Sequence, residues 1–452
     1  MDTEWRLSQT ARHLAGKTGR NAVVKNAPIW WEDAPPVSVA PEPVAPSCDV
    51  AIVGAGYTGL SAAITLARAG RRVQVFDKLR AGEGASSRNG GIASGNLRPS
   101  LAQMIRRFGK ERAIAMQAEA KAAREDLVQF ITQEGIDCDF KLTGRFTGAS
   151  SPDQYDRLRR EAEVLAGTLG IEAFALDRSR QRDALGTDYY WGGIVRMDIG
   201  GLHPAKLLAG MLRVAGDAGA TIHGETAVTR IVPASGGFEV ETARGNVRAR
   251  DVIVATNGYT DAANPWLRRR LVPVASCIIA TEPISANLMR TLMPKGYMCA
   301  ETRKLHYYYR PSPDGRRILF GGRGGSLGDA SAAATPRLKQ ALVDIFPELD
   351  ATGLTHSWFG YVAMNRDMVP RIFSHDGIHY AAGYCGSGVV WARWAGQKAA
   401  LNVLGGAKER SALDFRPPRA IPLYSGKPWF MPAVFAWYEL LDRLAARRHP
   451  RA

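Results

Sequence analysis

One glycine-rich segment near the start of the chain restricts the possible fold more than any other feature. Residues 49–53 form a short apolar run that leads into Gly54-Ala-Gly-Tyr-Thr-Gly59 and then into an alanine-rich segment. Residues 72–77 form a second apolar run that ends in Asp77. This order predicts a strand, a tight turn, a helix and a second strand, as in units that bind a dinucleotide.

Each residue type in this turn has a physical role. We expect Gly54 to permit the tight turn, Gly56 to let the backbone approach a pyrophosphate, and Gly59 to let the helix pack closely on the sheet. The helix N-terminus near Thr58 would face the phosphates, and Asp77 would bind a ribose hydroxyl. A lone Gly-x-Gly-x-x-Gly pattern is weak evidence, but both strands, the helix and the acid in register favour a dinucleotide site over an ordinary loop.

Length and cysteine usage set the broad class. The chain has 452 residues, 46% of them hydrophobic, which is enough for roughly two to three domains. Its five cysteines are scattered without a Cys-x-x-Cys pair, which favours a reducing compartment over disulfides and predicts no metal site. The N-terminus lacks the pattern of a secretory signal, and no apolar run reaches the ~20 residues that span a bilayer. We therefore expect a cytoplasmic globular protein.

The formal net charge of +16 is the unusual property of the composition. Such a charge attracts anionic partners, including nucleic acids and membrane surfaces. The basic residues are spread along the chain in short groups, as at 106–107, 159–160 and 268–270, and form no long block. We therefore favour an ordinary solvated surface and expect no nucleic-acid partner.

Residue periodicity predicts the remaining elements. Residues 33–47 are proline-rich and should lie as an extended strap across the surface, with Trp30-Trp31 as a possible anchor. Helices are expected at 101–134, with a possible break at Gly109, at 152–165 and from His203. Strands are expected at 221–223, 225–232, 238–242, 247–250, 251–258, 272–281, 304–310 and 317–321, and a last strand, turn and helix begin at 378.

These elements predict a mixed fold, α/β combined with antiparallel β. A discontinuous Rossmann-like nucleotide-binding domain would use residues 48–135, 190–261 and 355–405. A second, substrate-binding domain built on an antiparallel sheet would use residues 136–189 and 262–354. Residues 1–47 would form an N-terminal extension and strap, and residues 406–452 an amphipathic C-terminal tail.

Residues 82–91 form a second glycine-rich loop, with hydroxyl and amide side chains beside the glycines. Clustered N–H groups of such a loop suit a pyrophosphate or the polar edge of a flavin ring, although a flexible surface loop is an equal alternative from composition alone.

Four motifs in a fixed order carry a resemblance to a known family. They are the first glycine turn, the loop at 82–91, Ala255-Thr-Asn-Gly258 and Gly383-Tyr-Cys-Gly-Ser-Gly388. Together they resemble the FAD-dependent amino-acid and amine oxidases related to D-amino-acid oxidase, glycine oxidase and sarcosine oxidase. The sequence looks most like the gamma-glutamylputrescine oxidoreductase branch, and the similarity extends from about residue 28 to about residue 405.

The resemblance implies which residues bind FAD. The implied residues are Gly54, Gly56, Tyr57, Thr58, Gly59, Asp77, Lys78, Ser86, Ser87, Arg88, Asn89, Gly90, Gly91, Val228, Ala255, Thr256, Gly258, Gly383, Gly386, Ser387, Gly388 and Val389. Some members hold FAD covalently through a cysteine or a histidine. Here Gly360 stands where we place that cysteine, and residues 82–91 include no histidine, so we expect non-covalent FAD.

The sequence identifies the substrate residues less directly than the cofactor residues. Flavin takes a hydride from the carbon next to a neutral amine, so a dedicated catalytic base is not required. A substrate carboxylate would be bound by an arginine, for which Arg310 is the first candidate. Tyr307 and Tyr309 are further candidates and would share one face of its strand, with Tyr308 and Arg310 on the other. Tyr361, Met364 and Arg366 are weaker candidates near the flavin face. The alternative is that these are cross-strand aromatics beside a surface arginine.

The resemblance implies oxidation of a small primary or secondary amine or amino acid to an imine, with O2 reduced to hydrogen peroxide. The substrate would be gamma-glutamylputrescine-like or an N-substituted amino acid. One alternative is a dehydrogenase that passes electrons to a membrane quinone or a protein acceptor, with peripheral membrane contact through the C-terminal tail. A second alternative is a flavoprotein that binds or modifies tRNA.

Overall fold

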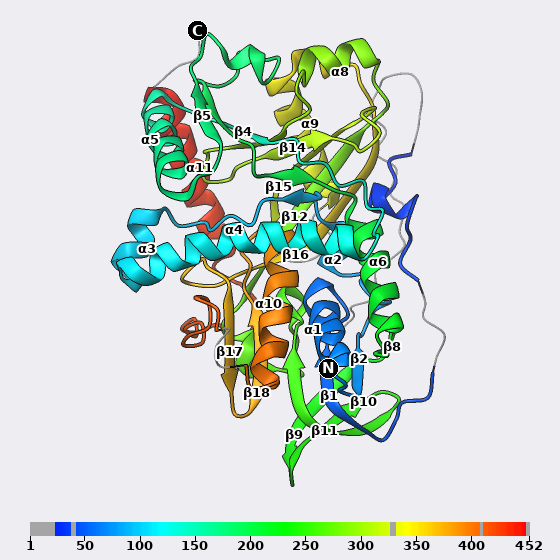
Figure 1. The fold of residues 1–452 in the computed structure, drawn as a ribbon. Helices are drawn as coiled ribbons and strands as arrows, with labels where there is room; N and C mark the ends of the chain where they lie inside the picture. Colours follow the sequence, from blue (N-terminus) through cyan, green and yellow to red (C-terminus); the bar gives the residue numbers. More distant parts are fainter. Residues whose placement is uncertain (1–22, 38–41, 326–330, 407–409, 449–452) are drawn as a thin grey trace.

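The structure is a computed structural model that describes residues 23–37, 42–325, 331–406 and 410–448. The expected extension at 1–22 and four strap residues, 38–41, lie outside the described residues. Within the described ranges the chain forms two sheets of eight strands each. The first sheet occupies the lower half of Figure 1, and the second sheet occupies the upper half.

The strands divide between the sheets as follows. The first sheet contains β1 (Ser47–Val53), β2 (Val73–Phe76), β8 (Thr221–His223), β9 (Val228–Ala234), β10 (Gly237–Thr242), β11 (Gly245–Val254), β17 (Arg371–His375) and β18 (Ile378–Ala382). The second sheet contains β4 (Arg145–Gly148), β5 (Ala173–Leu176), β6 (Gly193–Arg196), β12 (Val272–Thr281), β13 (Met298–Glu301), β14 (Tyr308–Pro311), β15 (Ile318–Gly325) and β16 (Leu354–Met364). A small third sheet pairs β3 (Ile92–Ala93) with β7 (Gly200–Gly201).

The helices are α1 (Tyr57–Arg68), α2 (Ala85–Arg88), α3 (Leu101–Phe108), α4 (Lys110–Gln133), α5 (Pro152–Leu169), α6 (Pro204–Asp217), α7 (Pro265–Arg268), α8 (Ala286–Leu292), α9 (Ser331–Ile345), α10 (Gly388–Val403) and α11 (Met431–Arg448). Short 3-10 helices lie at Ile29–Trp31, Gln181–Asp183, Asn257–Tyr259 and Pro347–Leu349.

The first sheet is parallel at its centre. β1 pairs in parallel with β2 and β11, β2 with β8, and β11 with β18. Its central strands are buried on both faces, which explains their nearly continuous apolar sequences. These strands come from three distant parts of the chain, so the expected discontinuous Rossmann-like fold is confirmed. The residue limits assigned to each domain stay a prediction.

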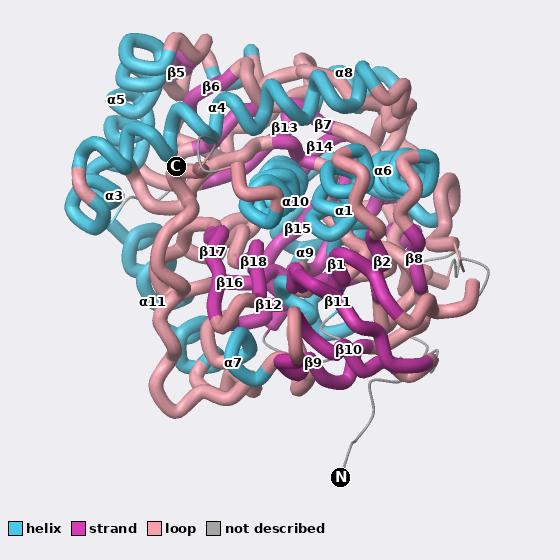
Figure 2. The backbone as a smooth tube through the Cα atoms, turned by 60° about the horizontal axis from the view of Figure 1, so that its bottom comes forward, coloured by secondary structure: helices cyan, strands magenta, loops and turns pink. Residues whose placement is uncertain are grey.

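Helices α1 and α10 lie side by side over this sheet (Figure 2). They approach closely because Gly396 has no side chain: a Cβ there would lie 2.1 Å from the carbonyl oxygen of Thr58. Their apolar faces join α4 and α6 in one core that includes Leu60, Ile64 and Trp391. The packing brings the N-termini of α1 and α10, which follow the two glycine turns, to the same side of the molecule.

The second sheet has the order β16-β12-β15-β14-β13-β4-β6-β5 and is antiparallel except where β13 pairs with β4. The expected antiparallel sheet is therefore present. The strand expected at 304–310 forms only from Tyr308, and that expected at 225–232 begins at Val228. β4, β5, β6, β13 and β16 were not expected, and all but β16 are four residues long, too short for a readable alternation.

Two helix predictions are refined by glycines. The helix expected at 101–134 is broken at Gly109, where φ is 85°, into α3 and α4. α5 runs to Leu169 and ends at Gly170, whose φ of 59° is left-handed.

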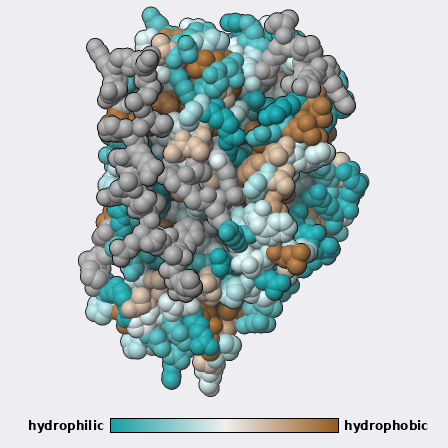
Figure 3. All heavy atoms as spheres, turned by 180° about the vertical axis from the view of Figure 1, so that it is seen from behind, coloured by the Kyte–Doolittle hydropathy of each residue, from teal (hydrophilic) through white to brown (hydrophobic). Residues whose placement is uncertain are grey.

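Among the described residues, no helix is both long and apolar enough to cross a bilayer. On the face shown in Figure 3, apolar side chains lie in small separate groups between hydrophilic ones.

Candidate active site

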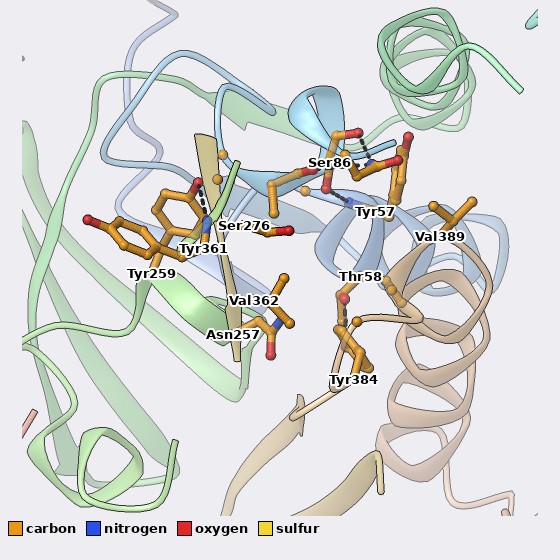
Figure 4. A pocket seen from close by; sticks show the side chains of 18 of the residues that line it. Tyr57, Thr58, Ser86, Asn257, Tyr259, Ser276, Tyr361, Val362, Tyr384 and Val389 are labelled. Atoms are coloured by element: carbon orange, nitrogen blue, oxygen red, sulfur yellow. Dashed lines mark hydrogen bonds between the residues drawn. The ribbon is translucent and has the colours of Figure 1, made fainter. Parts of the chain in front are cut away.

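A cavity of about 510 Å³ lies between the two sheets. Its wall on the first-sheet side comes from the β1–α1 turn, the end of β2, the loop at 82–90, the end of β11 and the β18–α10 turn. Its other wall is one face of the second sheet. Figure 4 shows side chains from both walls, including Tyr57 and Tyr384 on one side and Ser276 and Tyr361 on the other. The cavity is therefore the place where both parts of the fold meet.

The first glycine turn has the geometry of a close backbone approach. Gly54 has a φ of 107°, which disfavours any side chain. A Cβ on Gly59 would lie 1.9 Å from the carbonyl oxygen of Gly54, so α1 packs on the turn only with glycine there. A Cβ on Gly56 would lie 2.8 Å from the Ser86 hydroxyl, which accepts a hydrogen bond from the backbone N–H of Tyr57 at 3.0 Å (Figure 4). The turn and the N-terminus of α1 thus leave room for a pyrophosphate.

Asp77 lies at the end of β2 and lines the same cavity. Its carboxylate accepts hydrogen bonds from the backbone N–H groups of Ala55 at 2.8 Å and Leu79 at 2.9 Å. Burial nevertheless raises the pKa of Asp77 to about 6. A buried carboxylate in this position suits a donor such as a ribose hydroxyl, which would replace lost hydration. The neighbouring Lys78 ammonium donates to Asp261 at 2.6 Å and to the carbonyl oxygen of Tyr259 at 3.1 Å.

The loop at 82–91 is held by indole N–H groups. Trp30 donates to the carbonyl oxygen of Asn89 at 2.8 Å, and Trp358 donates to that of Arg88 at 2.8 Å. Trp31 donates to the Ser87 hydroxyl at 3.0 Å. The expected Trp30-Trp31 anchor therefore contacts the loop itself, and the loop is fixed rather than a flexible surface loop.

The second glycine turn joins β18 to α10 beside the first. The backbone N–H of Gly383 donates to the Asn257 side chain at 2.9 Å, which ties the turn to the end of β11. The hydroxyls of Thr58 and Tyr384 are 2.7 Å apart and link the two turns directly (Figure 4). Gly386 follows at a φ of 104° and lines the cavity.

The structure places most of the expected cofactor residues on the cavity wall. Those that line it are Gly54, Gly56, Tyr57, Thr58, Asp77, Lys78, Ser86, Arg88, Asn89, Gly90, Val228, Ala255, Thr256, Gly386, Ser387, Gly388 and Val389. Gly59, Ser87, Gly91, Gly258 and Gly383 lie behind the wall. Gly59 and Gly383 shape the turns, and Ser87 holds the loop through its hydrogen bonds to Trp31 and to the carbonyl oxygen of Gly82.

The face of the second sheet toward the cavity carries a row of side chains from adjacent strands. The row consists of Arg145 and Thr147 on β4, Ala300 on β13, Tyr308 on β14, Arg323 on β15, Ser276 and Ile278 on β12, and Gly360 on β16. The strand register aligns it, since Ala300 is opposite both Thr147 and Tyr308, and Ser276 is opposite both Arg323 and Gly360. The hydroxyls of Tyr308 and Ser276 are 2.9 Å apart.

This row corrects the expected substrate residues. Tyr309 is buried on the opposite face, with its hydroxyl 3.1 Å from that of Tyr190. Arg310 donates to the carbonyl oxygens of Gly91 and Leu202, both at 2.8 Å, and does not line the cavity.

Two further candidates also lie outside the cavity. Tyr307 packs against the core on the far face of the second sheet. Arg366 is exposed, with its guanidinium 3.5 Å from the carbonyl oxygen of Ala420. Met364 does not line the cavity either, so among the expected substrate residues only Tyr361 does.

Basic side chains dominate the end of the cavity beside this row, which we call the arginine end. It contains Arg98, Arg145, Arg303, Arg323 and His306. Arg303 forms two bonds of 2.7 Å with the carboxylate of Glu301. Burial and the nearby arginines at 98, 323 and 145 hold the pKa of His306 well below its usual range, so its imidazole is neutral.

Sequence reasoning missed this end of the cavity for two reasons. Arg145 and Arg323 lie on β4 and β15, where no motif marks an arginine as functional. Tyr308 was assigned to the face opposite Tyr307 and Tyr309, which is its true position, but the sequence does not show which face meets the cavity.

The parallel sheet carries a glycine turn and a buried acid after its second strand, and the antiparallel sheet lies across the same cavity. This is the architecture of a two-domain dinucleotide-dependent oxidoreductase. Residues 49–401 match the family described as DAO, FAD dependent oxidoreductase. The chain belongs to this family, which confirms the resemblance expected from its motifs, and FAD is the cofactor that the family implies.

Individual relatives agree with this assignment. The chain is 31% identical over 428 residues to "Probable oxidoreductase OrdL" of Rhizobium meliloti (strain 1021), covering 92% of this chain and 97% of that protein. It is 32% identical over 404 residues to "Gamma-glutamylputrescine oxidoreductase" of Escherichia coli (strain K12), covering 88% of this chain and 93% of that protein. The crystal structure of glycine oxidase from Geobacillus kaustophilus superposes with a TM-score of 0.70 at 22% identity, covering 84% of this chain and 99% of that chain, and so shares the fold.

Proposed function

We propose that this protein oxidises a small primary or secondary amine or amino acid to an imine, with O2 as electron acceptor and hydrogen peroxide as the product. The substrate is gamma-glutamylputrescine-like or an N-substituted amino acid, by analogy with the relative of that name. The observation that carries the proposal is one continuous cavity that extends from the first glycine turn to the row of polar side chains on the second sheet.

The side chains on the second sheet suit this reaction. Bound FAD accepts a hydride from a carbon next to a neutral amine. Arg98, Arg145 and Arg323 disfavour an additional positive charge, so they favour the neutral amine over the ammonium form. The hydrogen-bonded pair of Tyr308 and Ser276 offers polar atoms that orient the substrate against the opposite wall.

We also propose that FAD is held without a covalent bond and that the protein is cytoplasmic. Gly360 lines the cavity and has no side chain to attach. Cys385 lines it as well, but its buried thiol donates to the carbonyl oxygen of Gly383 at 3.1 Å, and burial raises its pKa. Acid denaturation followed by filtration should release all the yellow colour. Colour retained on the protein would contradict non-covalent binding.

The direct test is anaerobic bleaching of the yellow holoenzyme by a panel of amines and amino acids. At least one compound should remove the flavin absorbance, and aerobic turnover should then yield one hydrogen peroxide per substrate. Failure of every amine and amino acid to bleach the flavin would contradict the proposed reaction.

One observation favours a second candidate, a dehydrogenase that delivers electrons to a membrane quinone. The C-terminal helix α11 exposes Trp437 by 57%, Leu440 by 45% and Leu444 by 44%, so an apolar stripe faces outward at helical spacing. Rapid reoxidation of the reduced enzyme by a soluble quinone, with slow reoxidation by O2, would favour the dehydrogenase. The reverse order of rates would favour the oxidase.

A further inference from the structure

The charges at the arginine end are not balanced by the protein. Glu301 is the acid that lines this end, and its carboxylate pairs with Arg303 while also accepting from the Tyr190 hydroxyl and the backbone N–H of Tyr307. Glu161 and Asp198 act on Arg145 electrostatically but form no ion pair with it, and the Asp198 carboxylate is paired with Arg196 at 2.8 Å and Arg124 at 2.5 Å. Within the described ranges, Arg98, Arg145 and Arg323 have no ion pair or side-chain hydrogen bond with the protein.

Two of these arginines are also withdrawn from water. Arg323 is only 8% exposed although it lines the cavity. The Nε of Arg145 and the hydroxyl of Thr147, which share one face of β4, are buried without a hydrogen-bond partner. Unpaired buried cations are costly, and a protein retains them where a ligand supplies the missing anion.

The unpaired donors form two separate groups. Arg98 lies close enough to Arg323 to lower its pKa, and Arg323 also borders the second glycine turn, where a Cβ on Gly386 would be 3.2 Å from its guanidinium. Arg145 and Thr147 form the other group on β4. In the sheet, β14 and β13 separate β15 from β4. The backbones of β15 and β4, which carry the two groups, are therefore about 14 Å apart, at ~4.8 Å between neighbouring strands. Tyr308 and Ala300 fill the row between them.

We propose that the substrate is an amine that carries two carboxylate groups, one bound by Arg323 with Arg98 and the other by Arg145 with Thr147. This inference rests on the proposed amine oxidation and narrows its substrate class to the amino-acid alternative, since gamma-glutamylputrescine carries only one carboxylate. Amino dicarboxylates, and secondary amines with a carboxylate on each side of the nitrogen, have this form. The amine and the C–H bond to be broken then lie between the two carboxylates, over Tyr308. Each guanidinium then gains a bidentate carboxylate partner, which the protein itself does not supply.

The test compares two acids by calorimetric titration of the FAD-loaded enzyme. Glutarate and pentanoate share one chain length and differ in the second carboxylate. Glutarate should bind at least about tenfold more tightly, because hydrogen bonds to charged groups contribute that much or more. Equal affinity for the two acids in the native enzyme would overturn the inference without any variant.

Variants then assign the two carboxylate sites. Arg145→Gln and Arg323→Gln should each reduce glutarate affinity about tenfold, to the value for pentanoate. Arg159→Gln, on the exposed face of α5, removes the same charge from a residue that does not line the cavity and should leave both affinities unchanged. An unchanged preference for glutarate in Arg145→Gln, with normal FAD content, would contradict the second carboxylate site.

The same measurements separate this inference from the proposed reaction. Acid binding requires no turnover, so a preference for glutarate without bleaching by any amine would count against the reaction alone. Bleaching by amines with one carboxylate or none, together with slower bleaching by amino dicarboxylates, would overturn the dicarboxylate class and leave amine oxidation standing.

Discussion

The carboxyl group of Asp77 is buried at the end of β2, and burial raises its pKa from 3.8 to about 6. The folded protein therefore binds the carboxyl proton of Asp77 more tightly than the unfolded chain does. As a result, the FAD-free protein loses stability as the pH rises from about 4 to about 6 and regains none above that range. The loss is about 3 kcal/mol at most, from about 1.4 kcal/mol for each pKa unit. The ionised Asp77 side chain therefore destabilises the folded protein until a ligand donates a hydrogen bond to it.

Replacing Asp77 with asparagine should separate these two effects. In the FAD-free protein, Asp77→Asn should be more stable than the native chain by about 1 to 3 kcal/mol at about pH 7, and the difference should vanish near about pH 4. FAD affinity should fall about tenfold or more, because the acceptor for the ribose hydroxyl is weakened. Denaturant unfolding at both pH values and FAD titration measure the two effects. Asp217→Asn, in an exposed pair on α6, is the matched control.

At the scale of elements, three indole donors hold the loop at 82–91. Trp30 and Trp358 are almost fully buried, and each donates to a backbone carbonyl of this loop. The double variant Trp30→Phe with Trp358→Phe keeps most of the apolar contact and removes both donors. FAD should dissociate more readily, with an affinity loss of about tenfold or more from about 1 kcal/mol per bond.

Flavin fluorescence on dilution measures that loss. The control is Trp429→Phe, which changes an indole that is 62% exposed and donates to the carbonyl oxygen of Leu423 rather than to the loop. An equal loss in the control, or none in the double variant, would show that the loop is held by other contacts.

Helix α5 offers a matched pair of glycines. Gly170 ends the helix with a φ of 59°, and Gly167 lies inside its last turn, with open space around each. Gly170→Ala should destabilise the protein by about 1 kcal/mol, because alanine disfavours the left-handed conformation. Gly167→Ala should stabilise it by about 0.5 to 1 kcal/mol, because alanine loses less entropy in a helix. Thermal unfolding of both variants should give shifts of opposite sign.

The parts of the fold and of the site that the sequence predicts are those in which one local conformation requires one residue type. The turn at Gly54 and the break at Gly109 are of this kind, since each needs a positive φ. The substrate row is different, because it collects one or two residues from each of β4, β13, β14, β15, β12 and β16. Its members share a face only through strand register, and a one-residue shift exchanges Tyr308 for Tyr309. Arg310 illustrates the limit: it is buried, yet it bonds to backbone carbonyls behind the loop.

At the scale of the whole molecule, the C-terminal helix supports the cavity wall from outside. The carboxylate of Asp442 on α11 accepts hydrogen bonds from the backbone N–H groups of Lys304 at 2.9 Å and Leu305 at 3.2 Å. These residues lie between Arg303 and His306, which both line the arginine end. The last helix of the chain thus positions a segment that the proposed reaction needs.

Asp442→Ala should therefore raise the substrate KM about three- to tenfold, since two hydrogen bonds worth about 0.5 to 1.5 kcal/mol each position the segment. FAD content should not change, because the glycine turns lie on the other wall. Glu439→Ala, one turn earlier on α11 and paired only at 3.5 Å with Arg443, should leave the KM unchanged. A loss of FAD in Asp442→Ala would mean that α11 stabilises the whole cavity. An unchanged KM would mean that Arg303 and His306 keep their positions without the helix.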